Sequence, residues 1–100
     1  MDIQTLRKIR LRAADIVDQG WCQGAVARQE NGCATNASNP QAVAWCIYGA
    51  LLKATHEFQT CLFDHTGIDP TWNDAPGRTA AEVAGWLRTL AGMDHARMER

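Results

Sequence analysis

Apolar residues in the first twenty positions recur at steps of three and four, which is the spacing of one face of an α-helix. They are Ile3, Leu6, Ile9, Ala13, Ile16 and Val17, and most positions between them are charged or polar. The pattern predicts an amphipathic helix over residues 3–19, with Asp2 as its N-terminal cap and Gly20 at its end. A peptide of this length is only marginally stable alone, so the helix needs a core to lie on.

The helical spacing stops after Gln23. Asn31-Gly32 is a strong local signal for a tight turn between two strands. We therefore expect a short two-stranded hairpin between residues 23 and 35, although its flanks are rich in alanine rather than in β-branched residues.

Ser38-Asn39-Pro40-Gln41 has the features of a helix start, because a polar cap precedes a proline and a glutamine follows the serine by three residues. The next positions are apolar on most sides, so we expect a central, buried helix that runs to about Ala54. Residues 56–65 include Phe58, Cys61, Leu62 and Phe63 and predict a second short helix that ends near Gly67.

Residues 67–77 hold two glycines, two prolines and several Asp and Asn residues, which predicts a loop. Trp72 in this loop is either pinned into the core or displayed to a partner. Thr79-Ala80-Ala81-Glu82 is a capping box that begins a last helix, which we expect to end at Gly92. Residues 93–100 are then a charged, frayed tail.

These elements predict a mainly α fold. We expect a compact single domain over residues 1–92, with three or four helices and a small β-hairpin after the first helix. Four tryptophans stand where its core would form: Trp21, Trp45, Trp72 and Trp86. The length of 100 residues and a hydrophobic fraction of 46% are those of a protein that folds on its own.

Charge argues against nucleic acid as a partner. Ten basic and eleven acidic residues give a formal net charge of −1, so the chain neither attracts phosphates strongly nor imitates DNA. Four basic residues crowd the first helix, namely Arg7, Lys8, Arg10 and Arg12, but acidic residues flank them and favour a solvated helix face.

Hydropathy argues against a membrane partner. The N-terminus has no apolar signal core, and the longest apolar run, residues 42–52, is too short and too interrupted to span a bilayer. We therefore expect a cytoplasmic protein whose four cysteines are reduced thiols. The oligomeric state stays open.

Three tryptophan words stand out along the chain. Trp21-Cys22-Gln23-Gly24-Ala25 returns as Trp45-Cys46-Ile47-Tyr48-Gly49-Ala50-Leu51, and Trp72 opens the word Trp-Asn-Asp-Ala-Pro-Gly-Arg-Thr. In this order and spacing the words resemble a family of short, uncharacterised bacterial and phage proteins, over roughly residues 3–90. One departure is the segment 53–71 between the second and third words, which is often longer in that family.

The resemblance implies an accessory role, because members of this kind recur in phages and other mobile elements. It supplies no activity, catalytic residue or ligand, and an association of this kind names no mechanism.

Metal and cofactor chemistry have thin support. Cys61 and His65 stand at helical i and i+4, and zinc would accept them together with His56 and another cysteine. No Cys-x-x-Cys or His-x-x-x-His pair accompanies them, so a core cysteine and a surface histidine are favoured. The glycines follow no phosphate-loop spacing. We predict no metal and no cofactor.

A cysteine nucleophile is disfavoured for a similar reason. Cys22 or Cys46, with His56 or His65 and Asp74, would supply the residue types for covalent catalysis. Each of the two thiols follows a tryptophan in an apolar setting that should raise its pKa, and no local signature joins the set. We assign no catalytic residue.

The third word has two interpretations. Trp72, Asn73 and Asp74, followed by Arg78, would form a site for an anion or small ligand at the start of a helix. Alternatively Asn73 and Asp74 make Asx turns, Arg78 pairs with Asp74, and Trp72 closes the core. The structural interpretation is favoured, because turn chemistry explains every residue except the arginine.

For function we favour a small cytosolic interaction protein over an enzyme. We expect it to be an accessory of a phage or mobile element that binds and inhibits a host or defence protein through an exposed face. The alternative is a small-molecule-binding or cysteine-dependent catalytic domain. The candidate binding residues are Trp72, Asn73, Asp74, Arg78, Trp21 and Trp45. The pocket of the alternative is lined by Trp21, Cys22, Trp45, Cys46, Asn73 and Asp74.

Overall fold

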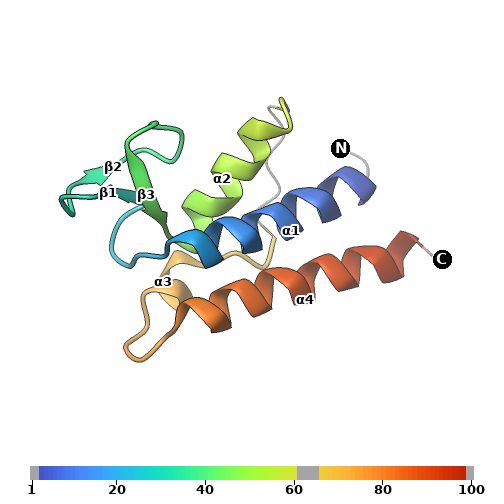
Figure 1. The fold of residues 1–100 in the computed structure, drawn as a ribbon. Helices are drawn as coiled ribbons and strands as arrows, with labels where there is room; N and C mark the ends of the chain where they lie inside the picture. The colour runs from blue at the N-terminus through green and yellow to red at the C-terminus, as the bar shows by residue number, and fades with distance from the viewer. Residues whose placement is uncertain (1–2, 61–65, 99–100) are drawn as a thin grey trace.

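The computed structural model describes residues 3–60 and 66–98, with side chains described through Met93. Within these ranges the chain forms four helices and a small three-stranded sheet (Figure 1). The helices are α1 (Ile3–Gln19), α2 (Ile47–Glu57), α3 (Pro70–Asn73) and α4 (Ala80–Met98), and the strands are β1 (Ala27–Gln29), β2 (Ala34–Thr35) and β3 (Ala42–Trp45). The fold is dominated by helices, as predicted, but the three-stranded sheet makes it mixed α/β rather than purely helical.

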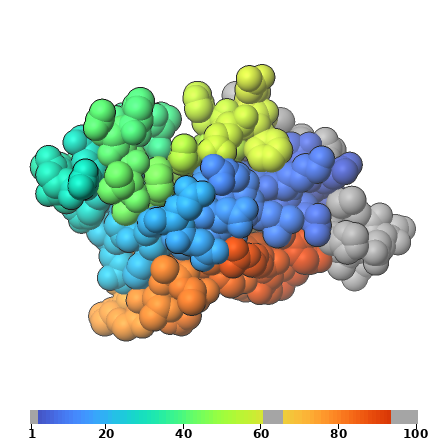
Figure 2. Space-filling model, in the orientation of Figure 1, coloured from blue at the N-terminus to red at the C-terminus, as the bar shows by residue number. Residues whose placement is uncertain are grey.

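Helix α1 is the central layer of the helical part. It lies side by side with α4, which runs in the opposite direction (Figure 1), and α2 covers its other side, so its atoms lie between those of α2 and α4 (Figure 2). The predicted apolar stripe faces both neighbours, and the largest fully buried side chains include Ile9, Ile16, Ile47, Leu51 and Leu87. Burial of this stripe supplies the core that the isolated helix lacks.

Polar side chains tie the three long helices together at their exposed edges. Arg12 on α1 donates from Nε to Glu57 Oε1 on α2 at 2.7 Å. Arg88 on α4 reaches Asp15 and Asp18 on α1, at 3.3 and 2.6 Å. All of these groups are substantially exposed, so each pair contributes at most about 1 kcal/mol.

The hairpin forms where the sequence predicts it. Strands β1 and β2 are antiparallel, and Gly32 takes a φ of +87° in the turn between them, where Gln29 N donates to Cys33 O at 2.9 Å. The sheet order is β2-β1-β3, and β3 pairs antiparallel with β1, with Ala27 opposite Trp45. The sheet lies at the end of α1 away from the chain termini (Figure 1).

The predicted helix from Ser38 to Ala54 is wrong in its first half. Asn39 forms a turn instead, since its Oδ1 accepts from Gln41 N at 2.9 Å and its carbonyl accepts from Ala42 N at 2.9 Å. The chain then extends as β3, and α2 begins only at Ile47, after the N-cap residue Cys46. Long-range pairing with β1 outweighs the local helix signal.

The second half of the molecule needs further corrections. Helix α2 ends at Glu57, and Gln59 takes a φ of +55°, so no second helix begins at His56; residues 61–65 lie outside the described residues. The expected loop contains the single-turn helix α3. The capping box is confirmed, because Glu82 N donates to Thr79 Oγ1 and Thr79 N to Glu82 Oε1, both at 3.2 Å.

Helix α4 does not end at Gly92 but continues to Met98. Gly92 is exposed and has no neighbouring atom within 4 Å of the Cβ position, so the helix passes through it with only the ordinary propensity loss of about 1 kcal/mol. None of the helices in the described part of the chain is long and apolar enough to cross a membrane.

Candidate functional site

The first two tryptophan words pair with each other in space. Trp21 and Trp45 form a parallel β-bridge, in which Trp45 N donates to Gly20 O at 3.1 Å and Cys22 N donates to Trp45 O at 3.2 Å. Trp45 is 6% exposed, and its indole N–H donates to Ala37 O at 3.0 Å. The recurrence of the word therefore has a structural role, and Trp45 offers no free surface for a ligand.

Asn73 joins the third word to the first two. Its Oδ1 accepts from the Trp21 indole at 2.8 Å and from Ile47 N at 2.9 Å, and its Nδ2 donates to Cys22 O at 3.1 Å. A second bond from Nδ2 reaches Asp74 Oδ1 at 2.9 Å. The side chain is fully buried, and these bonds use the full capacity of an amide. Asn73 is thus a structural junction rather than a ligand contact.

Asp74 and Gln23 strengthen this junction from the outside. Asp74 Oδ1 also accepts from Gly24 N at 3.0 Å, and Gln23 Nε2 donates to the carbonyls of Asn73 and Ala75 at 3.0 and 3.1 Å. The structural interpretation of Asn73 and Asp74 is therefore right about their role. It is wrong about simple Asx turns, because the long-range partners of these two side chains lie 26 to 52 residues away.

Trp72 and Arg78 form a stacked pair at the surface. The Arg78 guanidinium lies over the Trp72 ring, 4.1 Å from its centroid, and its Nε donates to Trp72 O at 3.1 Å. The partner carboxylate of Arg78 is Glu82, at 2.8 Å, and not Asp74 as expected. Trp72 is partly buried against the core, so it is pinned on one side and displayed on the other.

An open cavity of about 250 Å³ lies beside this pair. It is lined by Gly67, Asp69, Trp72 and Trp86, and the two tryptophan rings stand 6.4 Å apart with an angle of 51° between their planes. The Trp86 indole donates to Gly67 O at 2.7 Å, and Asp69 caps α3 by accepting from Thr71 N at 2.9 Å. Sequence analysis placed Trp86 in the core and missed Asp69, whose only local signal is the helix start Asp-Pro before Trp72.

Burial and, to a smaller extent, the neighbouring Cys46 raise the pKa of the Cys22 thiol to about 11. The pKa of Cys46 is also raised, because burial outweighs the hydrogen bonds from the Gly49 and Tyr48 amides. Both side chains are buried and neither forms a disulfide. They are poor nucleophiles near neutral pH, in agreement with the prediction from their apolar setting.

The structure contains part of the pocket that the sequence suggested for a catalytic or small-molecule-binding domain. A cavity of about 230 Å³ is lined by Gly24, Ala25, Val26, Cys46, Tyr48, Pro70 and Asp74. It brings together Cys46 and Asp74 but not Trp21, Cys22, Trp45 or Asn73. Of the described residues, one thiol of raised pKa and one carboxylate line the cavity, and none of its described lining residues is a histidine.

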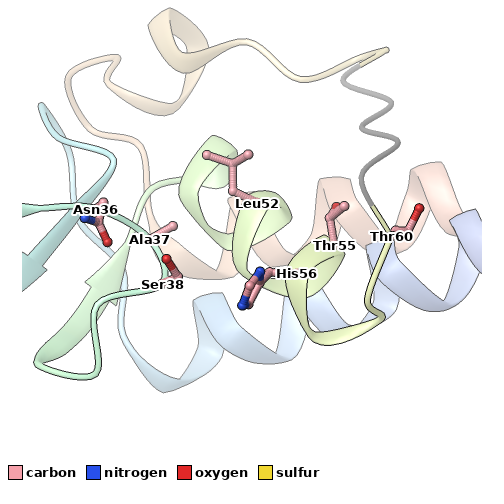
Figure 3. Close-up of a pocket in the computed structure, with 7 residues that line it drawn as sticks. All are labelled: Asn36, Ala37, Ser38, Leu52, Thr55, His56 and Thr60. Atoms are coloured by element: carbon pink, nitrogen blue, oxygen red, sulfur yellow. The ribbon is translucent and has the colours of Figure 1, made fainter.

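A further cavity of about 320 Å³ lies between the segment after β2 and the outer side of α2 (Figure 3). Its residues are Asn36, Ala37, Ser38, Leu52, Thr55, His56 and Thr60. None of these seven residues is a carboxylate, a lysine or an arginine. Nothing in the local sequence predicts that they lie together.

Among the side chains that the structure describes, in residues 3–60 and 66–93, no three His, Cys, Asp or Glu groups converge on a possible metal site. The proposed pair of Cys61 and His65 lies outside these residues. His56, the third member considered, lines the polar cavity on α2.

Comparison with known proteins assigns the chain to a family from its sequence and not from its structure. No curated protein and no solved structure matches it. A family profile does match, over residues 1–70, which include the first two tryptophan words and end just before the third. The chain belongs to this family, DUF6197, a family of unknown function.

Proposed function

We propose that this protein is a small interaction protein that binds a protein partner through the surface formed by Trp72, Arg78 and Trp86. The proposed partner is a host or defence protein, which the chain inhibits as an accessory of a phage or mobile element. The choice of partner is based on the resemblance of the three tryptophan words. The choice of surface is based on the geometry described above.

The observation that carries this proposal is the stacked pair of Trp72 and Arg78 beside an open cavity. Tryptophan and arginine are the residue types that dominate binding energy at interfaces, especially next to a pocket. The bonds from Arg78 to Trp72 O and Glu82 hold the guanidinium in place, so little side-chain entropy remains to be lost on binding.

The cavity beside Cys46 is the observation that favours the alternative, a small-molecule or catalytic site. Its thiol chemistry argues against catalysis, because the pKa of Cys46 is raised and the side chain is 4% exposed. Labelling of Cys46 by a neutral alkylating reagent should be slow in the folded protein and fast in urea. Fast labelling in the folded state would favour the alternative.

Site-specific photocrosslinking tests the interaction surface. A photoreactive amino acid replaces Thr71, which is exposed and adjacent to Trp72, and in a matched control replaces Val43, which is 48% exposed on β3. Each protein is exposed to lysate of the producing cells with and without phage infection, and crosslinked proteins are identified by mass spectrometry. We expect one partner to crosslink from position 71 and not from position 43.

Two further measurements complete the test. Arg78→Ala removes the stacked guanidinium and should abolish that crosslink while the circular dichroism spectrum stays unchanged. Addition of the chain to the purified partner should then reduce the partner's activity. A partner that crosslinks equally from both positions, or that ignores Arg78→Ala, contradicts the proposed surface.

A further inference from the structure

The cavity between Trp72 and Trp86 has the composition of a site for an organic cation. Its described lining consists of Gly67, Asp69 and the two tryptophans, whose ring centroids lie 6.4 Å apart. Asp69 supplies the carboxylate. The face of an indole ring is electronegative and attracts a cation that lies within about 6 Å of its centre. The two indole rings, whose planes make an angle of 51°, line the same cavity as the Asp69 carboxylate.

A hydrogen bond and a stacking contact hold the two rings in place. The Trp86 indole is bound to Gly67 O, and the Trp72 ring is covered by Arg78, which does not line the cavity. The guanidinium of Arg78 lies 4.1 Å from the centroid of the Trp72 ring, so this ring already binds one cation. A second cation would contact the parts of the two rings that line the cavity.

The charges around the cavity favour a positive ligand. The charge of Arg78 is offset by Glu82 at 2.8 Å, whereas Asp69 contributes a carboxylate to the wall itself. The bond from Thr71 N to Asp69 Oδ1 keeps this carboxylate at the start of α3. A cation in the cavity therefore meets two aromatic faces and a positioned negative charge.

We propose that this cavity receives a basic side chain, lysine or arginine, from the partner protein. This inference rests on the proposed function and names the group that the partner inserts. The volume of about 250 Å³ suits the end of a side chain, because sites that enclose a whole small molecule are usually larger, at about 300 to 1,000 Å³. The cavity is also continuous with the proposed interaction surface, since Trp72 belongs to both.

Titration with capped amino acids tests the inference without any partner. The intact protein is titrated with the N-acetyl methylamides of lysine, arginine and norleucine, where norleucine has the lysine chain without its ammonium group. We expect the indole N–H signals of Trp72 and Trp86 to shift in the NMR spectrum. Lysine or arginine should bind at least about threefold more tightly than norleucine. The Trp45 indole, which donates to Ala37 O, should not respond.

Removal of one charge provides the decisive comparison. Asp69→Asn keeps an oxygen that can cap α3 but removes the carboxylate charge, so the preference for lysine over norleucine should fall toward one. Glu30→Gln removes an exposed carboxylate in the hairpin and should leave the preference unchanged. Equal binding of norleucine, or an unchanged preference in Asp69→Asn, overturns the inference.

The remaining outcomes show whether the cation comes from a partner protein or from a free metabolite. They also show which of the two proposals fails. Choline that binds tenfold more tightly than both basic probes would make a free metabolite the ligand and overturn the assignment to a partner. If the crosslinking experiment finds no partner while the titration shows charge preference, only the proposed function fails. If a partner is captured but binding of the probes ignores charge, only the present inference fails.

Discussion

A single amide connects the three tryptophan words. Asn73 receives the Trp21 indole and the Ile47 amide and donates to the Cys22 carbonyl, although no part of it is exposed. A buried polar group that loses its hydrogen-bond partner carries the full desolvation penalty. Breaking one of these bonds therefore costs more free energy than the bond contributes, net, to stability. The residue is therefore more important for stability than its place in a polar loop suggests.

Removal of this amide should destabilise the protein strongly. We expect Asn73→Ala to lower the free energy of unfolding by about 3 to 5 kcal/mol, because an indole N–H, a backbone N–H and a carbonyl lose their partner inside the protein. Urea unfolding followed by circular dichroism measures the change. Asn31→Ala is the matched control, since Asn31 is exposed and caps a turn, and should cost about 1 kcal/mol or less. Equal losses in the two variants would contradict the junction.

The Cys22 thiol should make stability depend on alkaline pH. Its pKa is raised from 9.0 to about 11 in the folded protein, so the unfolded chain loses this proton first as the pH rises. The contribution to stability is complete below pH 9 and is lost progressively up to pH 11, by about 3 kcal/mol in total. Urea unfolding between pH 7 and pH 10.5, under reducing conditions, measures this loss.

Other groups also titrate in this range, so the comparison with Cys22→Ala isolates the thiol. The variant should lose less stability than the parent over the same pH interval. Parallel curves for the two proteins would show that the Cys22 pKa is not raised.

At the scale of elements, the start of α2 shows where local signals succeed and fail. The apolar residues after Ile47 were correctly predicted as a buried helix, but the cap was placed at Ser38 rather than at Cys46. The true cap uses partners that no local pattern shows: Asn73 Oδ1 receives Ile47 N, and Cys46 Sγ receives Gly49 N at 3.3 Å. A helix start that is completed from 26 residues away is invisible to a scan for capping boxes.

Other elements were predictable because their causes are local. Helix α1 follows from its apolar period, the hairpin from Asn31-Gly32, and the start of α4 from the capping box at Thr79. The structural interpretation of Asn73 and Asp74 was based on local turns, whereas their main partners lie 26 to 52 residues away and leave no local signal. The cavities depend on packing between elements, so the sequence predicted neither their positions nor the role of Asp69.

The contact between α2 and the segment before β1 depends on a missing side chain. A Cβ at Gly49 would lie 2.0 Å from Val26 O, which is backbone and has no room to move. We expect Gly49→Ala to lower the free energy of unfolding by about 3 kcal/mol or more. Gly85→Ala in α4 is the control, because nothing lies within 4 Å of its Cβ position, and the better helix propensity should stabilise by about 1 kcal/mol. Thermal unfolding of both variants measures the two changes in stability. A Gly49→Ala variant as stable as the parent would contradict the close approach of the Gly49 and Val26 backbones.

For the whole molecule, the family match and the core have different boundaries. The profile covers residues 1–70, but α4 supplies Val83, Ala84 and Leu87, each 0% exposed, to the core that α1 also builds. Without α4, one side of α1 would face water. Residues 1–70 therefore should not fold as a unit.

We expect a fragment of residues 1–70 to unfold without a cooperative transition in urea. Addition of a peptide of residues 71–100 should restore helical circular dichroism and a cooperative transition, because it returns Asn73 and the missing half of the core. A fragment that unfolds cooperatively on its own would show that α4 is dispensable. The same peptide with Leu87→Asp is the control and should not restore the transition.

The distances along the chain that Asn73 spans have a consequence for the order of folding. Its partners Trp21 and Ile47 are 52 and 26 residues away, so all three segments must arrive before the junction forms. Closing such long loops is costly in entropy, and contacts of this kind tend to form after the transition state. We expect Asn73→Ala to accelerate unfolding much more than it slows refolding in stopped-flow measurements. The junction would then determine how long the folded protein lasts rather than how fast it appears.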